Sequence, residues 1–435
     1  MKKILLVLFV FISIVFKAQT LYFKCTTISA PSVYPWGVAT NWYQDPLCTT
    51  TSTSGIPTSA NDVVINSNAF TANGQKIDFD QASMACKGFT VSYAGTFTNV
   101  AMQSVPAKVL NVFGHFDLSA FDNSKLSISN WKGDIVFNPA NISTLNVLTG
   151  GKTLVLNSIT IPGNTTTYTV NFNDSLFLNR VVPIAGNIGN INIGTGYTNA
   201  NAVIVNFNDL VKLGSINSFP AVCDQHSSIY IVSGIVNFNN GIFNTLPISS
   251  YQVSTYAPGY AGNTGGIVAS NSCSITLLPQ TYTNVAYPIA RQINNIGTLQ
   301  LIGTTAINSP TVNATNQTIR INGLVNADYS RLNFTNSVIN ANLYNGGYSW
   351  LIANTSTLTA TNSTLNVIPN GKSLLFNSAL YFRPTNIYNI INIFDNVLVQ
   401  NVGGTFSTKE FNVTVPHKLV TLQSGTSYCN IFPHG

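Results

Sequence analysis

One short motif recurs at spacings that only a few folds can accommodate. Val-Asn-Phe-Asn, followed by Asp or Asn, occurs three times between Val170 and Asn240, and a looser relative of it surrounds Phe137. The aromatic positions of these four segments are 35, 35 and 31 residues apart: Phe137, Phe172, Phe207 and Phe238. This irregular period is long for one propeller strand and short for a four-stranded blade, but it is typical of one coil of a parallel β-helix with loops of variable length.

We therefore predict an all-β fold, a single-domain, right-handed parallel β-helix solenoid with an N-terminal cap. Apolar residues alternate with polar ones over short runs, and the chain contains one Glu, so helical periodicity is nearly absent. In such a helix each strand lies about 4.8 Å above its equivalent in the previous coil, so that like residues stack. The four phenylalanines are expected to form one inward column. The 56 asparagines fit the turns, where Asn tolerates left-handed backbone geometry and amides can bond along the axis.

A second internal repeat joins distant parts of the chain. Residues 143–158 and 363–378 are identical at ten of sixteen positions, and each holds Ser-Thr-Leu-Asn-Val followed by Gly-Lys and Asn-Ser. Self-similarity of this kind supports a repeat architecture.

The first residues read as a secretory signal peptide. Lys2 and Lys3 precede an apolar run from Ile4 to Phe16, and we predict cleavage after Ala18. That run is about thirteen residues long, short of the roughly twenty that cross a hydrocarbon core, and no longer apolar segment follows. Loss of the leader's three lysines leaves 16 basic and 13 acidic residues. So weak a charge does not indicate a nucleic-acid partner, and we expect none. We also expect no transmembrane segment after cleavage.

The segment after the leader has a distinct composition. Trp36-Gly-Val-Ala-Thr-Asn-Trp42 is followed by Gly55-Ile-Pro-Thr and by Asp62-Val-Val-Ile65. This pattern resembles the opening of many bacterial secreted β-helix proteins, including large surface adhesins and autotransporter-like passengers. The resemblance implies fold and compartment rather than a reaction. An aromatic cap also has a physical purpose, because the first coil of a solenoid exposes an open sheet edge and an apolar end.

These observations divide the chain into three parts. Residues 1–18 form the signal peptide, residues 19–75 the N-terminal cap and first strands, and residues 76–435 the parallel β-helix. The expected location is the exterior of a Gram-negative bacterium, whether the cell surface, the extracellular medium or the periplasm.

Six cysteines follow the leader in a chain addressed to an oxidising compartment, so disulfides are expected. Cys25 and Cys48 flank the cap segment, and we predict that they are oxidised; buried free thiols are the alternative. Six cysteines allow fifteen complete pairings, and the sequence does not choose among them. The candidates are Cys25, Cys48, Cys86, Cys223, Cys273 and Cys429.

Few residues are candidates for chemistry. Asp78 and Asp80 lie two apart and would share one face of a strand, a separation suited to a pair of catalytic acids or to a Ca²⁺ site. A solvated strand face is the simpler interpretation, and we expect no cofactor or metal beyond that Ca²⁺ alternative. Asp174-Ser175-Leu176 resembles a three-residue site at which some Gram-negative bacteria O-glycosylate exported proteins, which makes Ser175 a glycosylation candidate.

Two classes of function fit this sequence. A non-catalytic surface protein, adhesin-like or structural, accounts for the scarce acids and for the exterior of Asn, Thr and Ser; its partners would be extracellular glycans or other cell-surface components. The alternative is a polysaccharide lyase or glycoside hydrolase on a pectate-lyase-like β-helix. A groove that gathers several acids with Arg or Lys would favour the enzyme. The oligomeric state is left open.

Overall fold

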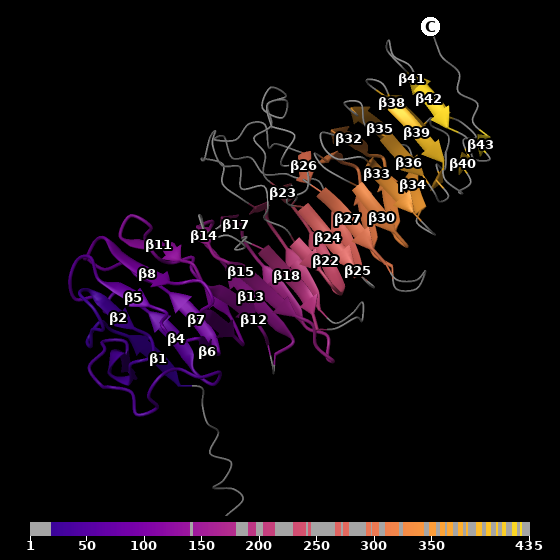
Figure 1. Cartoon of the computed structure of the whole chain (residues 1–435). Coiled ribbons are helices and arrows are strands. Elements are labelled where there is room, and N and C mark those ends of the chain that lie inside the picture. The colour runs from indigo at the N-terminus through magenta and orange to yellow at the C-terminus, as the bar shows by residue number, and fades with distance from the viewer. Residues whose placement is uncertain are drawn as a thin grey trace, which may run out of the picture.

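The computed structural model shows an all-β chain built as an elongated stack of short strands (Figure 1). Its only helix among the described residues is one 3-10 turn, η1 (Ala39–Asn41). Side chains are described up to Ile339 and at Ser363. The described residues are 19–139, 142–179, 190–196, 203–213, 229–240, 242–244, 266–270, 273–277, 293–296, 298–303, 309–321, 325–342, 348–353, 357–361, 363–368, 373–376, 380–381, 389–393, 397–401, 406–407, 411–414, 420–423 and 427–428.

The strands belong to four sheets, and two of them run along most of the stack. The 16-stranded sheet consists, in spatial order, of β3 (Trp42–Tyr43), β1 (Thr20–Phe23), β4 (Asp62–Ile65), β7 (Gly88–Val91), β10 (Phe116–Asp117), β13 (Thr144–Leu148), β16 (Thr169–Phe172), β19 (Ile204–Phe207), β22 (Gly234–Phe238), β25 (Cys273–Leu277), β28 (Thr311–Thr315), β31 (Arg331–Thr335), β34 (Thr357–Thr361), β37 (Leu380–Tyr381), β40 (Phe406–Ser407) and β43 (Ser427–Tyr428). The 13-stranded sheet consists of β42 (Val420–Gln423), β39 (Val397–Asn401), β36 (Ser373–Phe376), β33 (Tyr348–Ala353), β30 (Val325–Asp328), β27 (Thr298–Ile302), β24 (Gly266–Ser270), β21 (Ile229–Ile231), β18 (Asn190–Thr195), β15 (Ser158–Pro162), β12 (Asp134–Phe137), β9 (Val109–Val112) and β6 (Ser83–Cys86).

The other two sheets follow one another along the stack. The 4-stranded sheet consists of β11 (Leu126–Trp131), β8 (Val100–Ser104), β5 (Lys76–Asp78) and β2 (Val33–Pro35). The 10-stranded sheet consists of β14 (Thr153–Val155), β17 (Leu176–Asn179), β20 (Val211–Leu213), β23 (Ile242–Asn244), β26 (Ile293–Ile296), β29 (Thr318–Ile321), β32 (Val338–Asn342), β35 (Thr364–Ile368), β38 (Asn389–Ile393) and β41 (Phe411–Thr414).

From β4 onward, each strand pairs with the strand three elements later, except that β11 and β14 do not pair and belong to the two successive sheets, and consecutive strands lie in different sheets. One layer of the stack is therefore three consecutive strands, one in each of three sheets. All pairings between named strands are parallel except that of β1 with β3. This arrangement of parallel strands in stacked sheets is consistent with a solenoid of the β-helix kind, and the predicted all-β, mainly parallel fold is confirmed.

Strand alternation places the core between the sheets. In β16 the residues Val170 and Phe172 are fully buried, while Thr169 and Asn171 face outward. Parallel pairing repeats this pattern in register, so that Phe172, Phe207 and Phe238 lie directly above one another. Their rings stack face to face, with centroids 4.8 Å apart for the first pair and 5.1 Å for the second. The prediction of an inward phenylalanine column is confirmed for these three residues.

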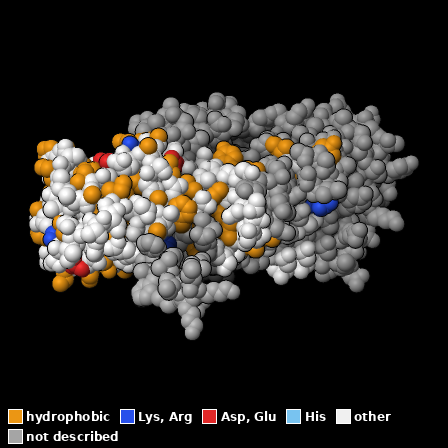
Figure 2. All heavy atoms as spheres, turned by 90° about the horizontal axis from the view of Figure 1, so that it is seen from below, with side chains coloured by type: hydrophobic (Ala, Val, Ile, Leu, Met, Phe, Trp, Pro, Cys, Tyr) orange, Lys and Arg blue, Asp and Glu red, His pale blue; other side chains and the backbone are white. Residues whose placement is uncertain are grey.

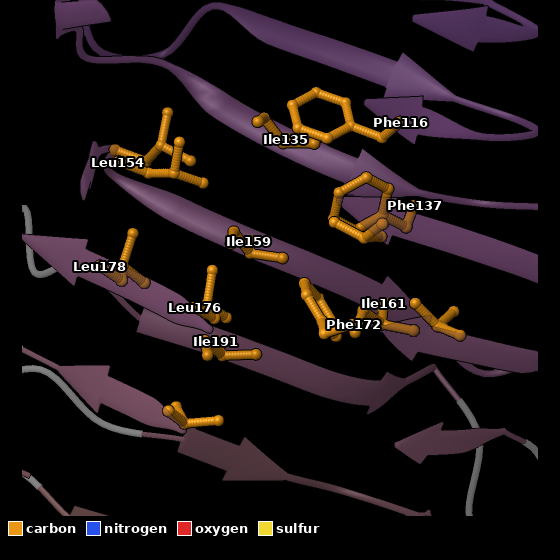
Figure 3. Close-up of a cluster of buried hydrophobic side chains, with 14 of the residues drawn as sticks. Phe116, Ile135, Phe137, Leu154, Ile159, Ile161, Phe172, Leu176, Leu178 and Ile191 are labelled. Atoms are coloured by element: carbon orange, nitrogen blue, oxygen red, sulfur yellow. The ribbon is translucent and has the colours of Figure 1, made fainter. Parts of the chain in front are cut away.

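Phe137 does not belong to that column. It lies on β12 in the 13-stranded sheet, and the register partner that precedes Phe172 in the 16-stranded sheet is Val147. Phe137 reaches Phe172 across the core instead, edge to face at 5.9 Å, as the labelled rings in Figure 3 illustrate. The first interval of 35 residues therefore spans four strands, whereas the second spans three.

Aromatic side chains close the N-terminal end of the core, as the sequence predicts. Trp36 and Trp42 are buried and meet edge to face at 4.6 Å, and the indole N–H of Trp42 donates to the Trp36 carbonyl at 2.8 Å. Asn41 is also fully buried, and its side-chain amide donates to the carbonyls of Thr27 and Pro35. Stacked rings continue from Trp36 through Phe79 into the first layers.

The second repeat does not mark equivalent places in the stack. Residues 143–158 supply β13 to the 16-stranded sheet and β14 to the 10-stranded sheet, whereas residues 363–378 supply β35 to the 10-stranded sheet and β36 to the 13-stranded sheet. The same strand-turn-strand pattern therefore serves at two different corners.

Candidate functional site

The outer face of the 16-stranded sheet carries ordered rows of asparagine. Because the register is exact from β13 to β22, outward residues of one column follow one another along the stack. In the first ladder each Nδ2 donates to the Oδ1 one layer earlier, at 3.2, 2.9 and 2.8 Å. Its members are Asn146, Asn171, Asn206 and Asn237.

A second ladder runs parallel to the first, just beyond the strand ends. Asn208 donates to Asn173 at 3.0 Å, and Asn239 donates to Asn208 at 2.8 Å. At its start Asn173 also donates to Asn146, so the two rows meet there. All these amide bonds point the same way, from later layers toward earlier ones. We call these seven residues the amide face.

The sequence predicts hydrogen bonding between amides along the axis, and the structure confirms it. The structure differs from the prediction in the position of these amides, because the first ladder occupies outward positions inside the strands rather than turns. The signal was present in the motif, since in Val-Asn-Phe-Asn the asparagines alternate with inward residues. Asn also occupies corners, where Asn316 and Asn336 have positive φ and bond to each other at 3.0 Å.

The amide face is uncharged and accessible. Its residues are exposed or half-buried, and the outward neighbours in the same strands include Thr144, Thr169, Ile204 and Ile235. On the side of the molecule drawn in Figure 2, charged side chains of the described residues are few and scattered. The chemistry that such a face offers is hydrogen bonding by neutral donors and acceptors.

The predicted acidic pair lies at the end of β5 in the 4-stranded sheet, where Asp78 is the last residue of the strand and Asp80 follows two positions later. Ile77 and Phe79 point inward and are fully buried, so Asp78 and Asp80 share the outward face, as predicted. Burial raises the pKa of Asp78, and the carboxylate of Asp80 raises it further, whereas a hydrogen bond with Gln103 lowers it. The two acids are therefore close enough to influence each other.

Both carboxylate oxygens of Asp80 already accept hydrogen bonds, one of them from the cap. Its Oδ1 accepts a hydrogen bond from the backbone N–H of Gly37 at 2.8 Å, and its Oδ2 accepts one from Gln81 at 2.5 Å. A Cβ at position 37 would lie 2.1 Å from the Gln81 amide nitrogen, so a larger residue there would displace the Gln81 side chain. Lys108 donates to the backbone carbonyl of Asp80. The pair thus joins the cap to the first layers.

Metal-ligating side chains do not gather in the part of the chain that the structure describes. No group of three or more His, Cys, Asp or Glu residues is close enough there to hold an ion. Asp78 and Asp80 alone supply two carboxylates, fewer oxygen ligands than Ca²⁺ takes.

Ser175 is not available for modification in the folded chain. Its side chain is 6% exposed, and its hydroxyl donates to the Oδ2 of Asp209, one layer later, at 2.6 Å. Asp174 accepts hydrogen bonds from Thr149 and Gly150, one layer earlier. The Asp-Ser-Leu segment is a corner that ties three layers together, and glycosylation of Ser175 stays a prediction.

The four described cysteines are buried and free in the structure, whereas the sequence predicts that Cys25 and Cys48 are oxidised. Cys48 instead directs its Sγ to the Phe23 carbonyl at 4.0 Å, and burial raises the pKa of its thiol to about 11. Burial also raises the pKa of Cys25, Cys86 and Cys273. Cys223 and Cys429 lie outside the described residues, as does the predicted signal peptide.

Among the described residues no helix is long and apolar enough to cross a membrane. Comparisons of the chain with protein-family models, with curated proteins and with solved structures found no match.

Proposed function

We propose that this chain is an exported, non-catalytic β-helix protein that binds extracellular glycans or other cell-surface components through its long lateral face. The amide face is the observation that supports this proposal. Its neutral donors and acceptors repeat in every layer from β13 to β22. Repeated weak contacts along one ligand raise the overall affinity without any single strong site, which suits adhesion.

The finer architecture that we propose is a right-handed parallel β-helix. The pairing of every third strand supports a helical path, and parallel strands joined by a crossover are right-handed in about 98% of cases. The paired tryptophans and the Asp62–Ile65 strand belong to the segment that resembles secreted β-helix proteins and surface adhesins. Export is supported by Lys2, Lys3 and the apolar run that follows them.

The proposal is tested with the purified mature chain, residues 19–435, on immobilised neutral and acidic polysaccharides and on intact bacterial cells. We expect retention on at least one of these surfaces, with no new reducing ends or unsaturated products, with or without Ca²⁺. Absence of binding to every polysaccharide and to cells would refute the proposed function.

An enzymatic alternative rests on one specific observation, the raised pKa of Asp78 beside Asp80. Pairs of acids whose environments separate their pKa values are typical of glycoside hydrolysis. The bonds from Asp80 to Gly37 and Gln81 disfavour this role, because they occupy both of its oxygens.

Product assays decide between the two functions. The double variant Asp78→Asn, Asp80→Asn is compared with Asp122→Asn, which changes an acid whose partner is the local Ser124. Polysaccharide cleavage by the wild type that disappears only in the double variant would identify an enzyme.

A further inference from the structure

We infer that the amide face binds one extended, uncharged polysaccharide chain, aligned with the axis of the stack. This inference rests on the proposed function and deepens it, because it assigns both the surface and the ligand class. Its members are the first ladder (Asn146, Asn171, Asn206, Asn237) and the second ladder (Asn173, Asn208, Asn239).

The first step concerns the hydrogen-bonding capacity that the ladders leave for a ligand. A primary amide has two N–H donors and two acceptor lone pairs. Asn206 gives one N–H to Asn171 and accepts one from Asn237. Each interior amide of the ladder therefore keeps a second N–H and a second lone pair. A sugar hydroxyl, which both donates and accepts, matches this remaining pair.

The second step concerns the entropic cost of binding. Immobilising a free side chain at an interface costs about 0.5–1.5 kcal/mol. The ladder bonds already hold each amide from both sides, as they do for Asn208 between Asn173 and Asn239. The conformational freedom of these side chains is therefore largely lost on folding, and a ligand meets an ordered surface.

The third step concerns the shape of the ligand. Equivalent residues in adjacent parallel strands repeat about every 4.8 Å, and alternate positions along one strand are about 6.6 Å apart. The amide face is thus a narrow two-row lattice, in which the first ladder spans four layers and the second spans three. A polymer that lies along the rows contacts many layers at once, whereas a monosaccharide contacts one.

The fourth step concerns charge. The ladders contain no Lys, Arg or His that would neutralise carboxylate or sulfate groups. The nearest acids at the adjoining corner are already bonded, Asp174 to Thr149 and Gly150, and Asp209 to Ser175 and Asn240. Lys152 interacts electrostatically with Asp174 but is itself buried. The ladders therefore offer an acidic polysaccharide no exposed cation, and neutral polymers are favoured.

The test is affinity gel electrophoresis of the mature chain in gels containing mannan, soluble cellulose ether or polygalacturonate. The triple variant Asn171→Ala, Asn206→Ala, Asn237→Ala removes one ladder. The matched control is Asn192→Ala, an outward amide on the 13-stranded sheet that bonds to Thr160 at 3.3 Å. Asn206→Thr serves as a variant that keeps the fold, because Thr276 occupies the same column in β25.

We expect the wild type to bind a neutral polymer, the triple variant to bind it at least about tenfold more weakly, and the control to bind it unchanged. Affinity should also rise with the length of manno-oligosaccharides. Unaltered binding by a triple variant that melts like the wild type would overturn the inference and leave the proposed function standing, as would a preference for polygalacturonate. Failure of the wild type to bind any polysaccharide or cell would overturn both.

Discussion

Replacement of Phe207 by Ala tests the register on which the whole description of the stack depends. The ring of Phe207 is fully buried and lies between Phe172 at 4.8 Å and Phe238 at 5.1 Å. Truncation of a buried Phe to Ala costs about 3 to 5 kcal/mol through lost burial and the cavity that remains. Each aromatic pair adds about 0.5 to 1.5 kcal/mol beyond burial, so we expect a loss in the upper half of that range.

The measurement must resolve local from global unfolding, because the stability of a stacked protein is approximately a sum over neighbouring layers. Hydrogen exchange read by mass spectrometry should show faster exchange in peptides that contain β16, β19 and β22, with little change in those that contain β4 and β7. The control is Tyr230→Ala, which removes an outward aromatic ring from a neighbouring layer and should change stability by less than about 0.5 kcal/mol. If the Phe207→Ala variant exchanges hydrogen and melts like the wild type, the Phe207 ring lies outside the core and the register is refuted.

Three further predictions concern buried polar groups. Asp209→Ala should lower the free energy of unfolding by about 1 to 3 kcal/mol, because the buried hydroxyl of Ser175 loses its acceptor; an unchanged urea midpoint would contradict this. Burial raises the pKa of Asp78 above 3.8, so as pH rises the carboxyl group of Asp78 ionises in the unfolded chain before it ionises in the folded chain. The free energy of unfolding therefore falls as pH rises from 3.8 through the raised pKa of the folded chain. Asp78→Asn should therefore be more stable than the wild type at neutral pH, and equal or lower urea midpoints there would refute that assignment. Burial of Cys25 and Cys48 predicts that iodoacetamide labels them only after unfolding, without reductant; a peptide that links either of them to another cysteine would instead support the oxidation that the sequence predicts.

The fold class could be predicted from sequence because strand alternation and a recurring motif are properties of the chain itself. The interval from Phe172 to Phe207 is one true layer, because both residues occupy the same position of the repeated motif and end strands that pair in register. The equal interval from Phe137 to Phe172 is a coincidence of strand and loop lengths. The number of residues in a period does not reveal how many strands that period contains. The number of strands follows from the strand pairing, which only the three-dimensional structure shows.

The candidate site could be predicted in part for the same reason. Strand periodicity correctly places Asp78 and Asp80 on one face, but it does not show that Gly37 of the cap occupies one of these carboxylates. The short motif around Ser175 does not show that its hydroxyl is bonded to Asp209, which the next layer supplies. Contacts between layers join residues about 30 positions apart, and local patterns do not contain that information.

The direction of the bonds between layers has a mechanical consequence. The inter-strand bonds run along the axis of the stack, so a pull on its two ends stretches the interfaces between layers one after another rather than shearing many bonds at once. Phe207 and Phe238 are register partners 31 residues apart, so the release of that layer would replace about 4.8 Å of stack by roughly 100 Å of extended chain. A protein that tethers a cell to a polymer under flow would then unfold layer by layer and dissipate the work done by a sudden force. The layers that stay folded would continue to bind the polymer.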